Sequence, residues 1–274
     1  MMRLGCMSLS YKEQFAAGKM DLRQFIDRAS EMRLEGVEFH TRAFESVVPS
    51  YLREVRMQCL KRGLTISYIG VSNDFGRPQA ELPGAVAEVK HWVDVAAFMG
   101  VPMVRVFAAW VRDGSTEEEV WERMMPCMHE VAAYGEKKGV VLGLHNHNHG
   151  CVTRTGRDVR RILETVNNPY LSHILDTGQY VGSPGASGAE GKEDPELDFY
   201  GSIAETAPLA VIVRAKIYRI QTGVEGWLNY PRIFEILNSV NYNGFVSVVY
   251  EGQAVEAEET AVPKAVDYLR QFIA

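Results

Sequence analysis

Short runs of apolar and β-branched residues alternate with longer stretches of helical periodicity along the whole chain. Runs of the first kind predict strands, and stretches of the second kind predict amphipathic helices. The expected strands cover residues 2–10, 36–40, 64–71, 102–108, 140–147, 171–176, 211–218 and 245–251. The expected helices cover residues 21–33, 50–62, 83–99, 117–138, 156–166, 197–206 and 231–240, and a last helix ends near residue 272.

The helix that begins near residue 117 has clear signals at both ends. Thr116 is a typical N-cap residue, and three glutamates follow it in the first turn, where the helix dipole favours acidic side chains. Gly139 stands where a helix commonly ends in a left-handed residue. We therefore expect this helix to run from residue 117 to 138.

The order of these elements predicts one parallel α/β domain over residues 1–274. Eight strand-then-helix units in 274 residues favour a closed (β/α)₈ barrel. No GxGxxG motif follows the first strand, so a dinucleotide-binding sheet lacks its main support. Segment 181–196 is rich in Gly, Ser and Pro and follows a strand, so it is either a lid over the site or a passive surface insertion.

Composition narrows the class of protein. The chain is 46% hydrophobic and 23% charged, with a net charge of −6, which argues against a nucleic-acid partner. No apolar run approaches the roughly 20 residues of a membrane helix, and the start has no signal-peptide pattern, so we expect a cytoplasmic protein. Homo-oligomerisation stays possible. The four cysteines form no CxxC pair and are expected to be buried apolar residues: Cys6, Cys59, Cys127 and Cys151.

Ionisable side chains stand at the carboxyl ends of the last four expected strands. In a barrel these ends meet at one mouth, where active sites form. Burying such groups is costly unless they are paired or functional, so a convergent set favours a site. Strand alternation would put the three histidines on one side if the fifth strand persisted that far. The set comprises His145, His147, His149, Asp176, Arg214, Lys216 and Glu251.

Four further residues are candidates for substrate binding. Glu38 and His40 end the second expected strand, and Gln179 follows the sixth. Glu38 either binds a substrate hydroxyl or is a structural partner of Arg105 or Lys216. Trp110, just beyond the fourth strand, either stacks on a sugar face or fills a loop.

Several motifs resemble those of the xylose-isomerase-like sugar phosphate isomerases and epimerases. VVLGLHNHNHG followed by LDTGQ is similar to their "LALENH … LDTGH" pattern, VRAKI to "HVHLKD", and GFVSVVYEG to "GYLSIEYEG". The resemblance covers the whole chain, and its specific motifs lie in the second half. It implies a (β/α)₈ barrel that moves protons beside a sugar carbonyl.

The family resemblance also implies a divalent cation, commonly manganese, magnesium or zinc, held by Glu, Asp, His and Glu. In this sequence the corresponding residues are His145, Asp176, Arg214 and Val249, and Gln179 replaces a helper histidine. Only Asp176 and His147 match the family pattern. Arg cannot be a metal ligand, and a unit charge about 4 Å from a divalent ion gives a repulsion of roughly 8 kcal/mol at an effective dielectric of 20.

Two interpretations of the site follow. In the first, His145, Asp176 and Glu251, either alone or with His147, form a remodelled site for manganese, zinc or magnesium. In the second, no metal binds: Arg214 and Lys216 supply the positive charge, and Asp176 holds Arg214 through a two-pronged hydrogen bond. His145 or His147 would then be the general acid or base, because histidine titrates near neutrality.

Three functions are consistent with these features. The first is an isomerase or epimerase acting beside the carbonyl of a sugar or sugar acid, with His145, His147, Arg214 and Lys216 as catalytic residues. The second is a lyase, either a decarboxylase or a dehydratase, acting on an oxidised sugar acid. The third is a non-catalytic sugar-binding homologue.

Overall fold

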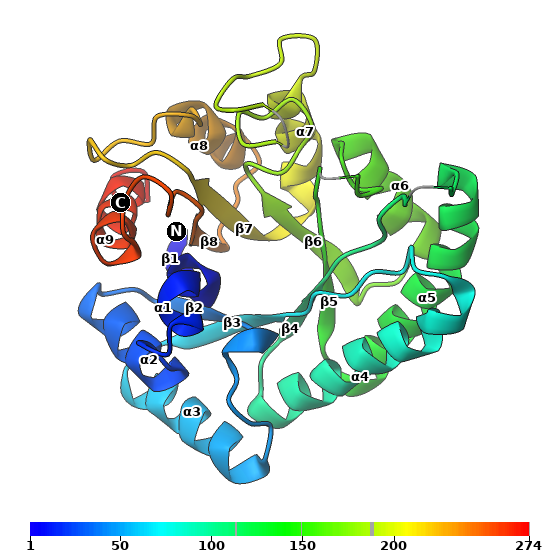
Figure 1. Ribbon diagram of the computed structural model, residues 1–274, viewed down its shortest axis with the longest axis horizontal. Helices are drawn as coiled ribbons and strands as arrows, with labels where there is room; N and C mark the ends of the chain where they lie inside the picture. The colour runs from blue at the N-terminus through cyan, green and yellow to red at the C-terminus, as the bar shows by residue number, and fades with distance from the viewer. Residues whose placement is uncertain (113, 149, 187–188, 274) are drawn as a thin grey trace.

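Eight parallel strands form a ring at the centre of the molecule, and the helices surround it (Figure 1). Each strand pairs with the next in sequence, and the last pairs with the first through registers such as Leu4 with Val246. The computed structural model describes residues 1–112, 114–148, 150–186 and 189–273. The alternation of elements along the sequence therefore correctly predicts a single closed (β/α)₈ barrel.

The strands are β1 Arg3–Met7, β2 Gly36–His40, β3 Thr65–Gly70, β4 Met103–Val106, β5 Val141–His145, β6 Leu171–Asp176, β7 Ala210–Ile217 and β8 Phe245–Tyr250. The helices are α1 Lys12–Ala16, α2 Leu22–Glu31, α3 Pro49–Lys61, α4 Leu82–Met99, α5 Glu117–Lys138, α6 Gly156–Val166, α7 Phe199–Thr206, α8 Tyr230–Ser239 and α9 Glu258–Arg270. The 3₁₀ turns are η1 Ser8–Tyr11, η2 Thr41–Ala43, η3 Gln79–Glu81 and η4 Ala207–Leu209.

Local signals account for the helix boundaries. Asp21, Thr116 and Thr155 each form a capping box with the residue three positions on, which satisfies otherwise unpaired backbone groups at the start of α2, α5 and α6. Gly139 ends α5 in the left-handed conformation, with φ of 71°. The predicted limits of α5 are therefore confirmed at both ends.

The first strand is shorter than expected: it ends at Met7, and the chain turns into η1 instead of continuing to residue 10. The turn is held by Ser10, whose Oγ donates to the Val248 carbonyl at 3.0 Å and accepts from the Tyr250 amide at 3.1 Å. This side-chain pairing competes with strand extension.

The fifth strand also ends early, at His145 instead of residue 147. Thr153 causes this, because its Oγ1 donates to the His145 carbonyl at 3.1 Å and accepts from the His147 amide at 3.2 Å. Strand alternation therefore does not extend to His147. His149 lies outside the described residues.

The barrel interior holds both apolar and polar side chains. A small buried cluster is made of Met7, Tyr68, Met103, Ile174, Ile212, Phe245 and Val249. A larger apolar core packs the outer face of the strands against the helices. All four cysteines are free and buried, as expected. No helix in the described part of the chain combines the length and apolarity needed to cross a bilayer.

The described part of segment 181–196 packs against the end of β7. The Gly185 backbone approaches so closely that a Cβ built there would lie 2.0 Å from the Tyr218 ring, and one at Gly191 would lie 2.5 Å from the Trp227 ring. Gly191 has a φ of 83°, which favours glycine. Tyr218 Oη in turn donates to the Gly178 carbonyl at 3.2 Å. Tyr218 therefore contacts both this segment and the turn that follows β6.

Candidate active site

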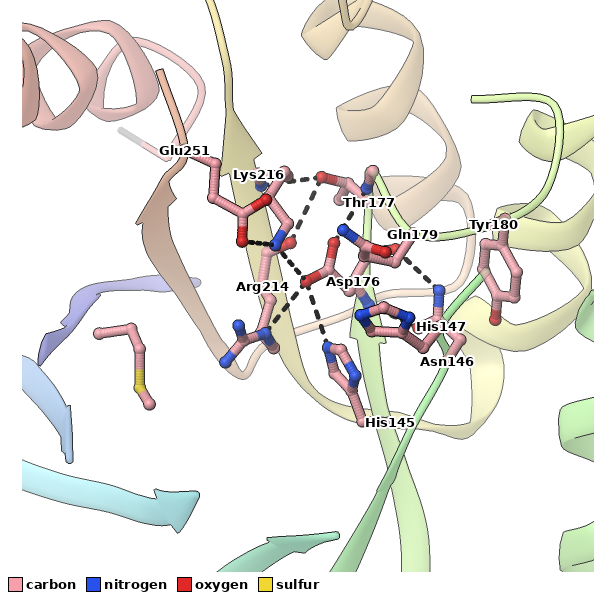
Figure 2. A network of polar contacts seen from close by, with 12 residues as sticks. His145, Asn146, His147, Asp176, Thr177, Gln179, Tyr180, Arg214, Lys216 and Glu251 are labelled. Carbon is pink, nitrogen blue, oxygen red and sulfur yellow. Dashed lines mark hydrogen bonds and ion pairs between the residues drawn. The ribbon is translucent and has the colours of Figure 1, made fainter. Parts of the chain in front are cut away.

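Asp176, the last residue of β6, lies at the centre of a buried ionic cluster at the barrel mouth (Figure 2). Its Oδ2 atom is 3.2 Å from His145 Nε2, 3.1 Å from Arg214 Nε and 3.3 Å from Lys216 Nζ. All four side chains are buried. The structure therefore brings together the predicted residues of β5, β6 and β7.

Backbone contacts fix the position of this carboxylate. Asn146 donates from Nδ2 to the Asp176 carbonyl at 3.0 Å, and its Oδ1 accepts from the Asp176 amide at 2.8 Å. The Gly178 amide donates to Asp176 Oδ1 at 3.1 Å. Asn146 lies between two histidines in the sequence, so its polar character alone did not distinguish it as a positioning residue.

Asp176 is ionised. Burial on its own would raise the pKa of this carboxyl group, but Lys216, the hydrogen bond from His145 and Arg214 together hold the pKa well below its usual range. An ionised carboxylate only accepts hydrogen bonds, so each contact to it must come from a donor.

The guanidinium group of Arg214 donates hydrogen bonds to two partners. Its Nε donates to Asp176, and its Nη1 donates to Tyr68 Oη at 2.6 Å. The prediction of a two-pronged hydrogen bond to Asp176 is therefore wrong, because the second donor of Arg214 binds Tyr68 of β3 across the barrel. Burial opposes the charge of Arg214, yet Tyr68 and Asp176 raise its pKa above the ordinary value. Arg214 is a fixed cation.

Lys216 joins the buried cluster to the rim. Its Nζ is 2.8 Å from Glu251 Oε1, while its backbone amide donates to Thr177 Oγ1 at 3.0 Å and its carbonyl accepts from Tyr230 Oη at 2.6 Å. Glu251 immediately follows β8, and its side chain is 37% exposed. Figure 2 shows Glu251 on the far side of Lys216 from Asp176.

His145 is a neutral imidazole. Burial lowers its pKa well below the ordinary value, and Arg214 and Arg105 add to this effect, although the hydrogen bond to Asp176 opposes it. This direction differs from the titration near neutrality that the sequence suggests for this residue. Because Asp176 can only accept, the neutral ring must carry its proton on Nε2. The lone pair then lies on Nδ1, which is buried and has no hydrogen-bond partner among the described residues.

Aromatic rings line the β4–β5 side of the mouth. The Phe107 ring lies edge-on to Trp110, His145 and His147, with centroids 4.8, 5.0 and 5.4 Å away. The Trp110 ring also contacts His147, at 5.6 Å. Three of these rings, on Phe107, Trp110 and His147, are partly exposed and form a wall beside the ionic cluster.

Gln179 lies near Asp176 and His147 in Figure 2. Its Oε1 accepts from Asn148 Nδ2 at 3.2 Å, and the side chain is buried. Its backbone amide donates to the Asp176 carbonyl at 3.4 Å, so the residue lies at the mouth beside the cluster.

Glu38 lies inside the barrel and has partners that the sequence did not indicate. Its Oε1 accepts hydrogen bonds from Ser247 and, at 2.6 Å, from Ser67. The suggested ion pair with Arg105 or Lys216 is therefore wrong. Burial raises the pKa of Glu38, which favours the uncharged carboxyl group.

His40 lies at the end of β2 beside a cavity of about 660 Å³ between the η1–α1 segment and η2. Its Nε2 is 3.0 Å from Ser72 Oγ, and its Nδ1 accepts from the Arg42 amide at 3.2 Å. Burial, Arg105 and Arg42 lower the pKa of His40 to about 3, so this ring is also neutral.

Arg105 on β4 is a buried residue that sequence analysis considered only as a partner of Glu38. It is 2% exposed, and its guanidinium lies 4.2 Å from the Phe107 ring centroid. Its Nε and Nη1 are buried and have no hydrogen-bond partner among the described residues. The only sequence signal was a charged residue inside an apolar strand.

The donor set does not fit a divalent cation. The Asp176 oxygen that would bind a metal contacts two cations and an N–H, and Glu251 is directed to Lys216. Metal-binding carboxylates instead need their lone pairs free for the ion. Among residues 1–112, 114–148, 150–186 and 189–273, no group of three or more His, Cys, Asp and Glu side chains is placed to hold a metal.

Known proteins resemble this chain in family and in fold. The model of a family described as "Xylose isomerase-like TIM barrel" matches residues 26–272. D-psicose 3-epimerase from Clostridium cellulolyticum H10, solved with D-tagatose, is 15% identical, with a TM-score of 0.79 over 99% of this chain and 98% of that one.

Two further solved structures are similar. For 3-keto-D-glucoside 4-epimerase from E. coli the identity is 15% and the TM-score 0.74, with 100% and 99% of the two chains covered. For D-allulose 3-epimerase from Methylomonas sp., solved with D-allulose, the identity is 16% and the TM-score 0.75, with 98% and 96% covered. No protein of curated function matches the chain.

Proposed function

Because this chain belongs to the family of xylose isomerase-like TIM barrels, we propose that it is an isomerase or epimerase that transfers a proton beside the carbonyl group of a sugar or sugar acid. The single observation that carries this proposal is the cluster around Asp176, in which a neutral imidazole and two fixed cations converge at the barrel mouth. The structurally similar proteins named above are sugar epimerases, which supports the same class of reaction.

His145 is suited to take the first proton. Its Nδ1 carries a lone pair without a protein partner in the described chain, and Asp176 holds the opposite side of the ring. When Nδ1 accepts a proton from the substrate carbon, the ionised Asp176 stabilises the imidazolium that forms. The low pKa of His145 keeps the imidazole unprotonated, which is the form that accepts a proton.

Arg214 and Lys216 are suited to stabilise the negative charge that develops on the substrate oxygen. Loss of a proton beside a carbonyl gives an enolate, and fixed cations in a buried site bind this form more strongly than the neutral ketone. Lys216, which Glu251 and Asp176 hold from opposite sides, carries an ammonium proton that it can give to the carbon; it then regains a proton from solvent, and His145 releases its own. In this proposal the side chains perform each step without a metal ion.

Solvent deuterium exchange tests this proposal. The purified protein is incubated in D₂O with a panel of ketoses, aldoses and sugar acids, with and without EDTA. We expect deuterium to enter the carbon beside the carbonyl at a rate that EDTA does not change. His145→Gln should slow exchange by about 10²–10⁴-fold, whereas His129→Gln, a change at an exposed histidine on α5, should leave it unchanged.

Three results would contradict the proposal. Loss of exchange after chelation, with recovery on adding Mn²⁺, would restore the metal-dependent interpretation. Release of CO₂ or water from a sugar acid would identify a lyase. Thermal stabilisation by sugars with neither exchange nor product would identify a non-catalytic sugar-binding protein.

A further inference from the structure

The charge of Arg105 is buried, and no described residue forms an ion pair with it. Two of its nitrogens are buried and unpartnered among the described residues, and no ion pair there includes it. A buried guanidinium without an acceptor is strongly disfavoured, so such groups are usually paired. The buried carboxyl group of Glu38 accepts from Ser67 and Ser247 through Oε1.

The guanidinium lies in a fitted space within the barrel. It stacks on Phe107, and a Cβ added at Gly70 would lie 3.0 Å from its Nη2 and 3.2 Å from its Nε. Gly70 pairs with Arg105 across β3 and β4, so glycine leaves room for the guanidinium there. The position of the group is therefore defined by packing, even though its hydrogen bonds are not made.

Arg105 faces the same space as the Asp176 cluster. It acts electrostatically on Arg214, His145 and His40, and burial together with Arg214 lowers its own pKa to about 9, so it stays charged at neutral pH. The Phe107 ring, on which the guanidinium lies, also contacts His145. A ligand on Arg105 would therefore lie within reach of the proposed base.

We infer that Arg105 binds the carboxylate of an acidic sugar, with the sugar ring lying along Phe107, Trp110 and His147 and its carbonyl group directed to His145 and Lys216. Nη1 and Nη2 of a guanidinium point two parallel N–H donors along one edge, which matches a carboxylate. The partly exposed aromatic rings offer an apolar face for the C–H groups of a sugar. This inference rests on the proposed function, since it names the substrate class of that site.

The charges at the mouth favour a carboxylate over a phosphate. Arg105, Arg214 and Lys216 are cationic. Asp176 and Glu251 are the carboxylate partners of Arg214 and Lys216, while Glu38, His40 and His145 favour their neutral forms. One positive charge is left uncompensated. A sugar carboxylate carries one negative charge at neutral pH, whereas a phosphate monoester carries about 1.5 to 2.

Direct binding measurements test this inference. Calorimetry and thermal unfolding are carried out on the full chain with D-glucuronate, D-galacturonate and D-gluconate, and with D-glucose, D-galactose and D-glucose 6-phosphate for comparison. We expect at least one sugar acid to bind more tightly than its neutral counterpart and than the phosphate ester. Arg105→Met should weaken that binding by about 30-fold or more, the effect of losing a charge-assisted pair.

The variants also separate binding from structure. Without ligand, Arg105→Met should have a higher Tm than the wild type, because an unpaired buried charge is replaced by an apolar side chain of similar length. Arg105→Lys keeps the charge but loses the two parallel N–H donors, and should bind the sugar acid with intermediate affinity. Arg161→Met is the matched control: Arg161 also stacks on an aromatic ring, at 3.8 Å from Trp121, but on the exposed surface.

Several outcomes would overturn the inference: equal binding of the sugar acid by wild type and Arg105→Met, tighter binding of the phosphate ester, or a lower Tm for Arg105→Met with no acid bound. Deuterium exchange distinguishes the two proposals. Exchange of neutral sugars without acid binding would leave the proposed reaction standing and remove the carboxylate site. Binding of a sugar acid through Arg105 without any deuterium exchange would support the carboxylate site and contradict the proposed reaction.

Discussion

On the β6–β7 side of the barrel mouth, Arg214 has a carboxylate and a phenol as partners, whereas on the β4 side Arg105 lies against Phe107 and forms no ion pair with any described residue. Both guanidinium groups are buried. The pKa of Arg214 is raised by Tyr68 and Asp176 against the effect of burial, and that of Arg105 is lowered to about 9 by burial and Arg214. The first arginine is satisfied by the folded chain, and the second is satisfied only by what the chain binds.

The largest effect should come from removing the counterion on the paired side. Asp176→Asn leaves Arg214 and Lys216 without their shared carboxylate and removes the group that orients His145. We expect a loss of about 3–5 kcal/mol in the free energy of unfolding, the usual cost of breaking a buried ion pair. Chemical denaturation measures this change. A loss below about 1 kcal/mol would show that solvent already compensates these charges.

The two arginines should respond in opposite directions to the same substitution. Arg214→Met leaves Asp176 with fewer counterions and should destabilise the protein by about 3 kcal/mol. Arg105→Met removes an uncompensated charge and should be neutral or stabilising by about 1–3 kcal/mol. Denaturant unfolding of both variants beside Arg161→Met measures the difference. An equal loss in the free energy of unfolding for the two variants would contradict the distinction between a paired Arg214 and an unpaired Arg105.

Acid titration sharpens the comparison on the β2 side, where His40 lies near Arg105. Its folded pKa of about 3 is below the unfolded value near 6.5, so the unfolded chain binds the proton first and stability falls as the pH falls below 6.5. The expected loss is about 2 kcal/mol for this group between pH 6.5 and pH 5. His40→Asn should remove that part of the pH dependence in denaturant unfolding measured at each pH. An unchanged slope would contradict the assignment.

The smallest effect should come from filling the space beside the unpaired arginine. Gly70→Ala places a methyl group about 3.0 Å from Arg105 Nη2, so the guanidinium must shift by a few tenths of an ångström. We expect sugar-acid affinity to fall by about 3–10-fold, since misplacing a bidentate group weakens its hydrogen bonds. Calorimetry with the tightest-binding sugar acid measures this. Gly84→Ala, at a glycine with open space around it, is the control.

The sequence predicted most of the fold and one side of the site, for an identifiable reason. Strand and helix periods are local, and Asp176, Arg214 and Lys216 stand at strand ends, where convergence follows from barrel topology. Arg105 was not recognised because its significance lies in partners that it lacks, which only the folded structure reveals. The split of Arg214 between Asp176 and Tyr68 also depends on a contact across the barrel.

The close fit of segment 181–196 on β7 has a consequence for how a sugar reaches the site. Gly185 and Gly191 lie in close contact with Tyr218 and Trp227, so we expect this border of the mouth to stay closed to a substrate. We predict that a sugar enters from another border, through the hollow beside His40 between the η1–α1 segment and η2. A bulky side chain placed in that hollow would slow substrate binding and product release without changing the rate of proton transfer at the Asp176 cluster.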